Sequence, residues 1–212
     1  MLNPLDLQSI AESREAAKSW AAFEGRMATY WSKAPMAEDQ WKRTGGKFLL
    51  WQGSDVDVAG VLFRVPVIGN YARPLMVTPE VPEVGIPVSL EGVRLHVLGQ
   101  VTFPTGFPVV GSDGEAVAYY TLRYASGKTS DVPLRNGYEV AQTNLIHVAT
   151  RINPAATEAQ PALLFPKDIA REQYQVLLFS IPLGSEKLER FSCKLNGQDA
   201  ALAVFAITLE QM

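Results

Sequence analysis

Reactive side chains are scarce in this sequence of 212 residues. Cys193 is its one cysteine, and His96 and His147 are its two histidines. A single thiol excludes an internal disulfide, so a packed core has to hold the fold together. No HExxH, paired CxxC, GxSxG or Walker sequence occurs. The metalloprotease, zinc-site, serine hydrolase and nucleotide-binding classes therefore lack the residues they require.

Neither histidine stands in a recognisable catalytic motif. His96 alternates with Leu95 and Val97 in a predicted strand, and we expect it to be a solvated or sheet-face imidazole. The sequence thus predicts that the chain is not an enzyme. A glycosidase needs two carboxyl groups about 5 to 10 Å apart, and the 22 Asp and Glu residues leave that weaker alternative open.

A large excess of one charge is also lacking. The chain has 19 Lys and Arg residues against 22 Asp and Glu residues, for a formal charge of −3. Nucleic-acid binding depends on clustered cations, so we expect no such partner. No apolar run approaches the ~20 residues that cross a bilayer, and residues 1–10 lack the pattern of a signal peptide. We therefore expect no membrane partner.

The residues that are abundant indicate short strands. Hydrophobic residues make up 47% of the chain, and 14 Pro and 16 Gly accompany them. The apolar content is sufficient for a core, and frequent Pro and Gly indicate many turns. The predicted fold class is all-β, a β-sandwich of jelly-roll type with one N-terminal helix.

The predicted helix begins near Ser9, which has capping-box spacing with Glu12. An apolar stripe at three- and four-residue steps then follows along one helical face. The stripe consists of Trp20, Phe23, Met27, Tyr30 and Trp31. This face either packs on the chain's own sandwich or docks on a neighbouring module. Residues 1–46 are predicted to be a helical appendage or linker, and residues 47–212 the sandwich domain.

Short apolar runs separated by turn residues follow residue 47. Alternation in residues 93–101 predicts one face toward a core and the other toward solvent. The same alternation places Tyr119 and Tyr120 on opposite faces, one in the core and one exposed. The predicted strands are 47–51, 58–68, 75–77, 86–90, 93–101, 116–124, 129–134, 145–150, 162–165, 174–181, 188–195 and 200–209.

The order of several segments resembles a family of β-sandwich accessory domains. These segments are 60–65 (GVLFRV), 86–88 (IPV), 94–99 (RLHVLG), 120–127 (YTLRYASG), 132–140 (VPLRNGYEV), 174–183 (YQVLLFSIPL) and 203–210 (AVFAITLE). From about residue 47 to 210, the chain is similar to galactose-binding-like, carbohydrate-binding domains appended to bacterial glycoside hydrolases. The resemblance implies glycan binding or packing between modules.

Sugar binding requires flat aromatic faces together with amide, carboxylate or guanidinium groups. Aromatic and polar side chains near predicted turns meet this requirement, with the best cluster at residues 135–144. The predicted ligand-binding residues are Trp41, Trp51, Arg73, Arg135, Asn136, Tyr138 and Asn144.

A structural calcium ion is a further expectation, because domains of this superfold often carry one. Calcium takes six to eight oxygen ligands. Asp55 and Asp57 share one side of an extended chain, and Glu210 joins them if the first and last strands meet. No catalytic metal is expected.

The sequence therefore predicts a non-catalytic module that binds a polysaccharide or oligosaccharide. As part of a larger secreted glycoside hydrolase, it would be extracellular and would have a catalytic domain as a partner within the same parent protein. The alternative is a structural accessory sandwich that mediates packing between modules.

Overall fold

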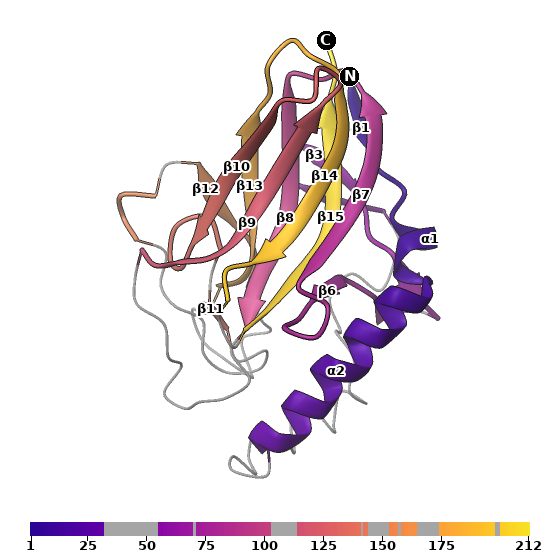
Figure 1. The fold of residues 1–212 in the computed structure, drawn as a ribbon. Helices are drawn as coiled ribbons and strands as arrows, with labels where there is room; N and C mark the ends of the chain where they lie inside the picture. The colour runs from indigo at the N-terminus through magenta and orange to yellow at the C-terminus, as the bar shows by residue number, and fades with distance from the viewer. Residues whose placement is uncertain are drawn as a thin grey trace.

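A computed structural model describes residues 1–31, 55–69, 71–102, 114–140, 142–143, 153–156, 158–164, 174–197 and 200–212. In these residues, two helices and fifteen strands follow one another along the chain (Figure 1). The predicted strands 47–51 and 145–150, and the predicted domain boundary after residue 46, lie outside the described residues.

The larger of two main sheets has seven strands (Figure 1). Its central path is β1-β15-β8-β13-β12, with β6 added beside β15 and β11 beside β8. Neighbouring strands are antiparallel except for β11, which runs parallel to β8. The strands are β1 (Leu2–Pro4), β6 (Leu75–Val77), β8 (Arg94–Thr102), β11 (Gln142–Thr143), β12 (Ala159–Leu164), β13 (Tyr174–Pro182) and β15 (Ala201–Glu210).

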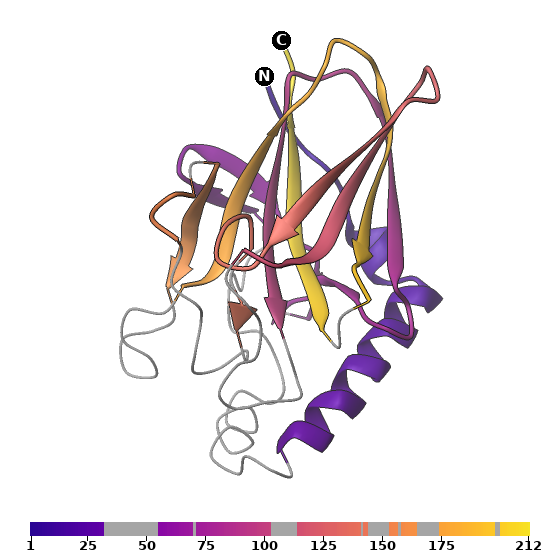
Figure 2. The ribbon, with the colours of Figure 1, turned by 60° about the vertical axis from the view of Figure 1, so that its left-hand side comes forward.

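The smaller main sheet has four antiparallel strands in the order β10-β9-β14-β7. They are β7 (Glu83–Leu90), β9 (Ala116–Tyr124), β10 (Thr129–Arg135) and β14 (Leu188–Leu195). This sheet faces the larger one, as Figure 2 shows. The expectation of an all-β, sandwich-like architecture is confirmed.

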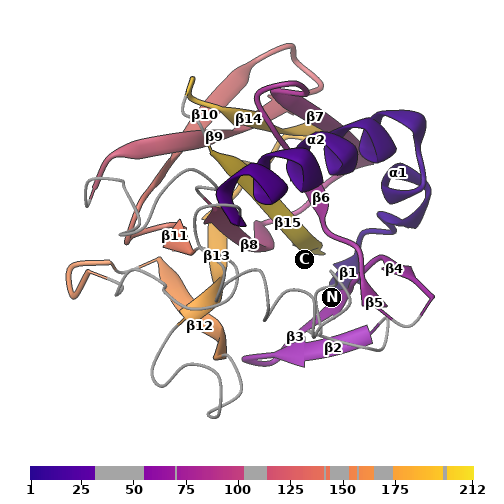
Figure 3. The same cartoon turned by 90° about the horizontal axis from the view of Figure 1, so that it is seen from below.

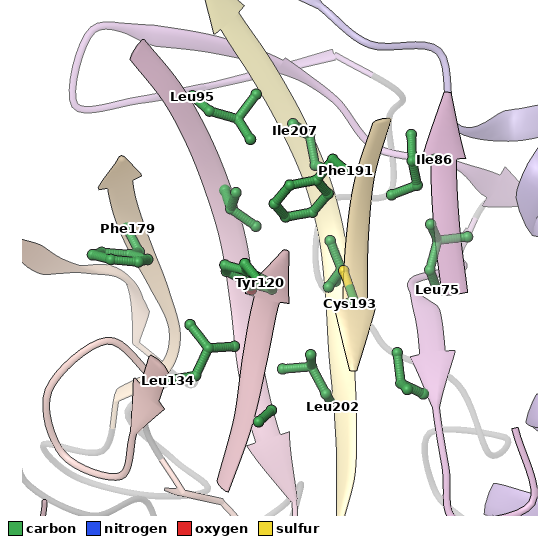
Figure 4. Close-up of a cluster of buried hydrophobic side chains, with 14 of the residues drawn as sticks. Leu75, Ile86, Leu95, Tyr120, Leu134, Phe179, Phe191, Cys193, Leu202 and Ile207 are labelled. Atoms are coloured by element: carbon green, nitrogen blue, oxygen red, sulfur yellow. The ribbon is translucent and has the colours of Figure 1, made fainter. Parts of the chain in front are cut away.

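Aromatic and aliphatic side chains from both main sheets form the core between them (Figure 4). Tyr120 of β9 lies at its centre, with its ring centroid 4.9 Å from that of Phe191 and 6.5 Å from that of Phe179. All three side chains are buried. Because β9 alternates, Tyr119 points to the opposite, outer face and is partly exposed. The prediction that these two tyrosines face opposite sides is confirmed.

The second face of the large sheet is also covered, as Figure 3 shows from below. Helix α2 (Arg14–Trp31) contributes buried Trp20 and Phe23, and strand β3 (Val61–Arg64) contributes buried Phe63. These residues pack with Phe205 and Leu98 of the sheet. The predicted wet face of strand 93–101 is therefore wrong, because a helix and a hairpin shield it. Strand β15 is buried over almost its whole length for the same reason.

The helical segment starts with two helices instead of one. Helix α1 (Gln8–Ala11) has Leu7 at its N-cap and no side-chain cap, so the predicted capping box of Ser9 and Glu12 is wrong. The Ser13 hydroxyl instead accepts a hydrogen bond from the Ala16 backbone N–H (3.1 Å) at the start of α2. The stripe residues Met27, Tyr30 and Trp31 have side chains outside the described part of the chain.

Helix α2 is tied to the large sheet by polar as well as apolar contacts. The buried Ser19 hydroxyl donates to the Met76 carbonyl (2.5 Å) on β6. Strand β1 adds to the same sheet by pairing Leu2 with Glu210. Within the described residues, the N-terminal segment therefore packs on its own sandwich.

The predicted strand 58–68 is interrupted by two short hairpins. Strand β2 (Asp55–Val58) pairs with β3, and β4 (Val67–Ile68) pairs with β5 (Tyr71–Ala72). Ala59 and Gly60 have φ angles of 53° and 79°, and these positive values reverse the chain in a tight turn.

Among the described helices, none is long and apolar enough to cross a membrane.

Candidate functional site

The outer face of the four-stranded sheet carries a row of unlike side chains across all four strands. In register, Pro133 of β10 lies beside Tyr119 of β9, Tyr119 beside Lys194 of β14, and Lys194 beside Glu83 of β7. Lys194 and Glu83 are exposed, and the Tyr119 side chain is partly exposed. The row thus sets an aromatic ring next to a cation, and the cation next to an anion.

The next row supplies hydroxyl groups. The Thr121 hydroxyl donates to the Asp131 carboxylate at 2.6 Å, across the β9–β10 pair. Ser192 of β14 is in register with Thr121 and is buried. The Arg190 Nε donates to the Ser192 hydroxyl at 3.4 Å. Hydrogen-bonding groups on this face therefore hold one another in fixed directions.

A hollow of about 370 Å³ lies over these two rows. Its lining residues come from all four strands and from the turn after β14. They are Glu83, Tyr119, Thr121, Thr129, Asp131, Lys194, Leu195 and Asn196. Asn196 is held in place because its side-chain nitrogen donates to the Ala116 carbonyl at 2.8 Å. An aromatic ring among hydroxyl, amide and charged groups suits a small polar ligand that has apolar C–H faces.

Two carboxyl groups line the hollow, but they come from opposite edges of the sheet. Glu83 is on β7 and Asp131 is on β10, with β9 and β14 between them. Three strand spacings separate their backbones by about 14 Å. Both carboxyl groups can accept hydrogen bonds from a ligand in the hollow.

Of the predicted ligand-binding residues in the 135–144 cluster, Arg135 ends β10, and Asn136 and Tyr138 follow it in the next loop. The Arg135 guanidinium pairs with the Glu139 carboxylate at 2.5 Å, and its Cζ lies 4.5 Å from the centroid of the Tyr138 ring. Asn136 is fully buried. Tyr119 pairs with Pro133, which lies two residues before Arg135 on β10. This loop therefore lies at the same end of the four-stranded sheet as Tyr119.

Arg73 lies on the other side of the molecule. Its Cζ is 4.1 Å from the centroid of the Trp20 ring on α2, and its backbone N–H donates to the Pro66 carbonyl at 2.7 Å. Desolvation by burial lowers the pKa of Arg73 to about 10, while the charge of Glu24 acts in the opposite direction. The structure therefore separates Arg73 from the 135–140 loop. Trp41, Trp51 and Asn144 lie outside the described residues.

The predicted calcium ligands have protein partners. Asp55 pairs with the Arg64 Nε at 3.1 Å, and the Asp57 carboxylate accepts a hydrogen bond from the Gly60 backbone N–H at 3.1 Å. Glu210 lies 3.4 Å from the Nε2 of His96. The described part of the chain contains no group of three His, Cys, Asp or Glu side chains placed to hold a metal ion. The calcium site stays a prediction.

His96 stands in a polar array that the sequence did not indicate. Its Nδ1 is 2.8 Å from the Ser180 hydroxyl on β13, and its Nε2 faces Glu210 on β15. The imidazole is buried, so the expectation of a solvated ring is wrong, although it does lie on a sheet face. Desolvation by burial lowers the pKa of His96, and the hydrogen bond and charge of Glu210 oppose that effect.

A hydroxyl, an imidazole and a carboxylate in this order match the elements of nucleophilic catalysis. Such chemistry also requires free N–H donors for a developing oxyanion. The backbone N–H of Ser180 donates to the Glu158 carbonyl at 3.4 Å. Ser180 is also flanked by its register partner His96 within the sheet. The hydroxyl of Ser180 and the carboxylate of Glu210 provide hydrogen-bond partners for both ring nitrogens of the buried imidazole.

Comparison with known proteins adds no assignment. No protein-family model matches the chain, and no curated protein matches it. The function is therefore inferred from the site itself.

Proposed function

We propose that this chain is a non-catalytic carbohydrate-binding module of galactose-binding-like, jelly-roll type. It binds a polysaccharide or oligosaccharide on the outer face of the four-stranded sheet. We further propose that it belongs to a larger secreted glycoside hydrolase, whose catalytic domain it holds near the polymer. Tethering of this kind raises the local concentration of the catalytic domain, even when one binding site is weak.

One observation carries the proposal: the partly exposed Tyr119 ring lies in a shallow hollow whose other walls are mostly polar. A sugar ring has a C–H-rich face that packs on an aromatic ring, and hydroxyl groups at its edge that need hydrogen-bond partners. Asp131, Lys194 and Asn196 offer an acceptor, a donor and an amide around Tyr119. All of them are positioned by strands or by a hydrogen-bonded turn, so little ordering is needed on binding.

The alternative of a structural accessory domain depended on a helix face that docks on a neighbour. Trp20 and Phe23 instead pack into the chain's own large sheet. These two residues are therefore not available to a second module, and the hollow around Tyr119 favours glycan binding.

Affinity electrophoresis through gels that contain soluble polysaccharides tests the proposal. We expect retardation by at least one glucan, galactan, xylan or mannan. Tyr119→Ala should weaken binding about tenfold or more, because loss of a stacked ring removes roughly 1.5 kcal/mol. Tyr119→Phe keeps the ring and should retain most of the binding.

Ile68→Ala is the matched control, since it truncates a side chain that is 49% exposed on a hairpin away from the four-stranded sheet. It should bind like the wild type. Absence of retardation on every glycan, or retardation that survives Tyr119→Ala unchanged, would overturn the proposal.

A further inference from the structure

A second hollow of about 220 Å³ lies beside the first, along the edge strand β7. It opens between this strand and the start of the helical segment. Its polar walls include Glu15, Glu83 and Arg190, and its apolar walls include Ile10 and Leu75. Sugar rings require this combination of polar and apolar walls.

Glu83 lines both hollows. The first hollow extends across the sheet from Asp131 on β10 to Glu83 on β7, and the second begins on the other side of Glu83. Four strands span about 14 Å between their outer backbones, so the combined path is longer than one sugar ring. A continuous path of this kind fits a linear chain of several sugar residues.

Arg190 reaches the second hollow because Gly85 leaves room for it. A Cβ on Gly85 would lie 1.8 Å from the Arg190 Nη2, so any larger residue would displace the guanidinium. The Nε of Arg190 donates a hydrogen bond to the Ser192 hydroxyl, and this bond holds the Arg190 side chain across β7. The guanidinium is therefore a positioned donor for ligand hydroxyl groups.

The charges of the two hollows disfavour an anionic ligand. Their combined lining has three acidic residues, Glu15, Glu83 and Asp131, against two basic residues, Lys194 and Arg190. A glycan rich in uronate or sulfate groups would meet a surplus of like charge.

We infer that the two hollows are adjoining subsites for several residues of one neutral polysaccharide chain. The chain crosses β9 and β14 at Tyr119 and continues past Glu83 to Arg190. This inference rests on the proposed function and adds to it the class of glycan and the length of chain that is recognised.

Isothermal titration calorimetry with gluco-, galacto-, xylo- and manno-oligosaccharides of two to six residues tests the inference. For the series that binds, wild-type affinity should rise with chain length. Arg190→Ala should weaken binding of the longest oligosaccharide about tenfold, the effect of one lost hydrogen bond from a charged donor. It should leave binding of the shortest bound oligosaccharide within about twofold.

Gly85→Ala is a second variant that removes no polar group from the chain. It should reproduce the loss seen with Arg190→Ala, because it moves the guanidinium away from β7. Tyr119→Ala should instead weaken binding at every length.

The possible failures are distinguishable. Wild-type affinity that is independent of length, equal effects of Arg190→Ala on short and long ligands, or preference for polygalacturonate over all neutral glycans would overturn the inference and leave glycan binding intact. Failure of every glycan to bind would overturn the proposed function, and the inference with it.

Discussion

A Cβ atom added to Gly99 would lie 2.8 Å from the hydroxyl oxygen of Tyr120 and 3.5 Å from the Ala203 carbonyl oxygen. Gly99 belongs to β8 of the large sheet, and Tyr120 belongs to β9 of the small sheet. The tyrosine ring is fully enclosed by the core (Figure 4). The two main sheets therefore approach each other closely at Gly99, where the large sheet carries no side chain.

Gly99→Ala should destabilise the fold by about 1 to 3 kcal/mol, because the added methyl group overpacks a rigid part of the core. The measurement is urea unfolding followed by tyrosine and tryptophan fluorescence. Tyr120→Phe removes the hydroxyl that the methyl group would meet. The cost of Gly99→Ala should therefore be smaller in the Tyr120→Phe background, and an equal cost in both backgrounds would contradict this account of the contact.

The ion pair of Arg135 and Glu139 should stabilise the loop after β10. The Glu139 side chain is 10% exposed and accepts hydrogen bonds from both the guanidinium and the backbone N–H of Arg135. Arg135→Ala should cost about 2 to 3 kcal/mol, because it leaves a largely buried carboxylate without its cation.

A double-mutant cycle with Glu139→Gln separates this effect from simple loss of packing. The neutral amide needs no cation, so adding Arg135→Ala to Glu139→Gln should cost less than Arg135→Ala alone. If the losses in unfolding free energy from the two single substitutions add up to that of the double variant, the ion pair contributes nothing beyond the separate contacts of its two residues.

His96 should make stability depend on pH. Burial lowers its pKa in the folded chain, with Arg94 acting in the same direction and Glu210 in the opposite one. The unfolded chain therefore takes up a proton near its ordinary pKa of about 6.5, while the folded chain resists protonation. The contribution of neutral His96 to the free energy of unfolding is fully present above the pKa of the unfolded chain. It is lost as the pH falls toward the pKa of the folded chain.

The free energy of unfolding should therefore fall more steeply between about pH 7.5 and pH 5 in the wild type than in His96→Gln. Both chains keep the same carboxyl groups, so the difference between their profiles isolates the imidazole. Parallel pH profiles for the wild type and His96→Gln would mean that the His96 imidazole has the same pKa in the folded and unfolded chains.

Cys193 should be unreactive in the folded protein. It is buried against Tyr120 and Phe191, and desolvation by burial raises the pKa of its thiol, with the charge of Glu83 acting in the same direction. Iodoacetamide reacts with the thiolate, so the native chain should resist alkylation that goes to completion in denaturant. Mass spectrometry of the intact chain measures this, and rapid native alkylation would show that the core opens at β14.

Much of the sandwich could be predicted because its strands alternate cleanly between turns. The strands predicted at 75–77, 116–124 and 188–195 agree with β6, β9 and β14 to the residue. The long strand predicted at 58–68 was wrong because Ala59 is not a residue that usually signals a turn, although the following Gly60 is. Burial of both faces of the large sheet was also missed, since the sequence does not say which surface a helix covers.

The candidate site was less predictable, because it depends on register between strands that are distant in the sequence. Alternation showed that Tyr119 or Tyr120 would be exposed, but not which of the two. The positions of Lys194 beside Tyr119 and of Asp131 beside Thr121 follow from the pairing of β9 with β14 and β10. Arg135, Asn136 and Tyr138 lie close together because they are near neighbours in the sequence, with Arg135 at the end of β10 and the other two in the following loop; their role in ligand binding stays a prediction.

The most direct test of glycan binding on the four-stranded sheet is a two-dimensional amide NMR titration with a neutral hexasaccharide. Binding at the proposed site should produce saturable shifts at Tyr119, Thr121, Asp131 and Lys194, with Leu62 and Ile68 unchanged on the opposite side. Shifts confined to the hairpins around Leu62 and Ile68, or no shifts with any of the four neutral series, would contradict it.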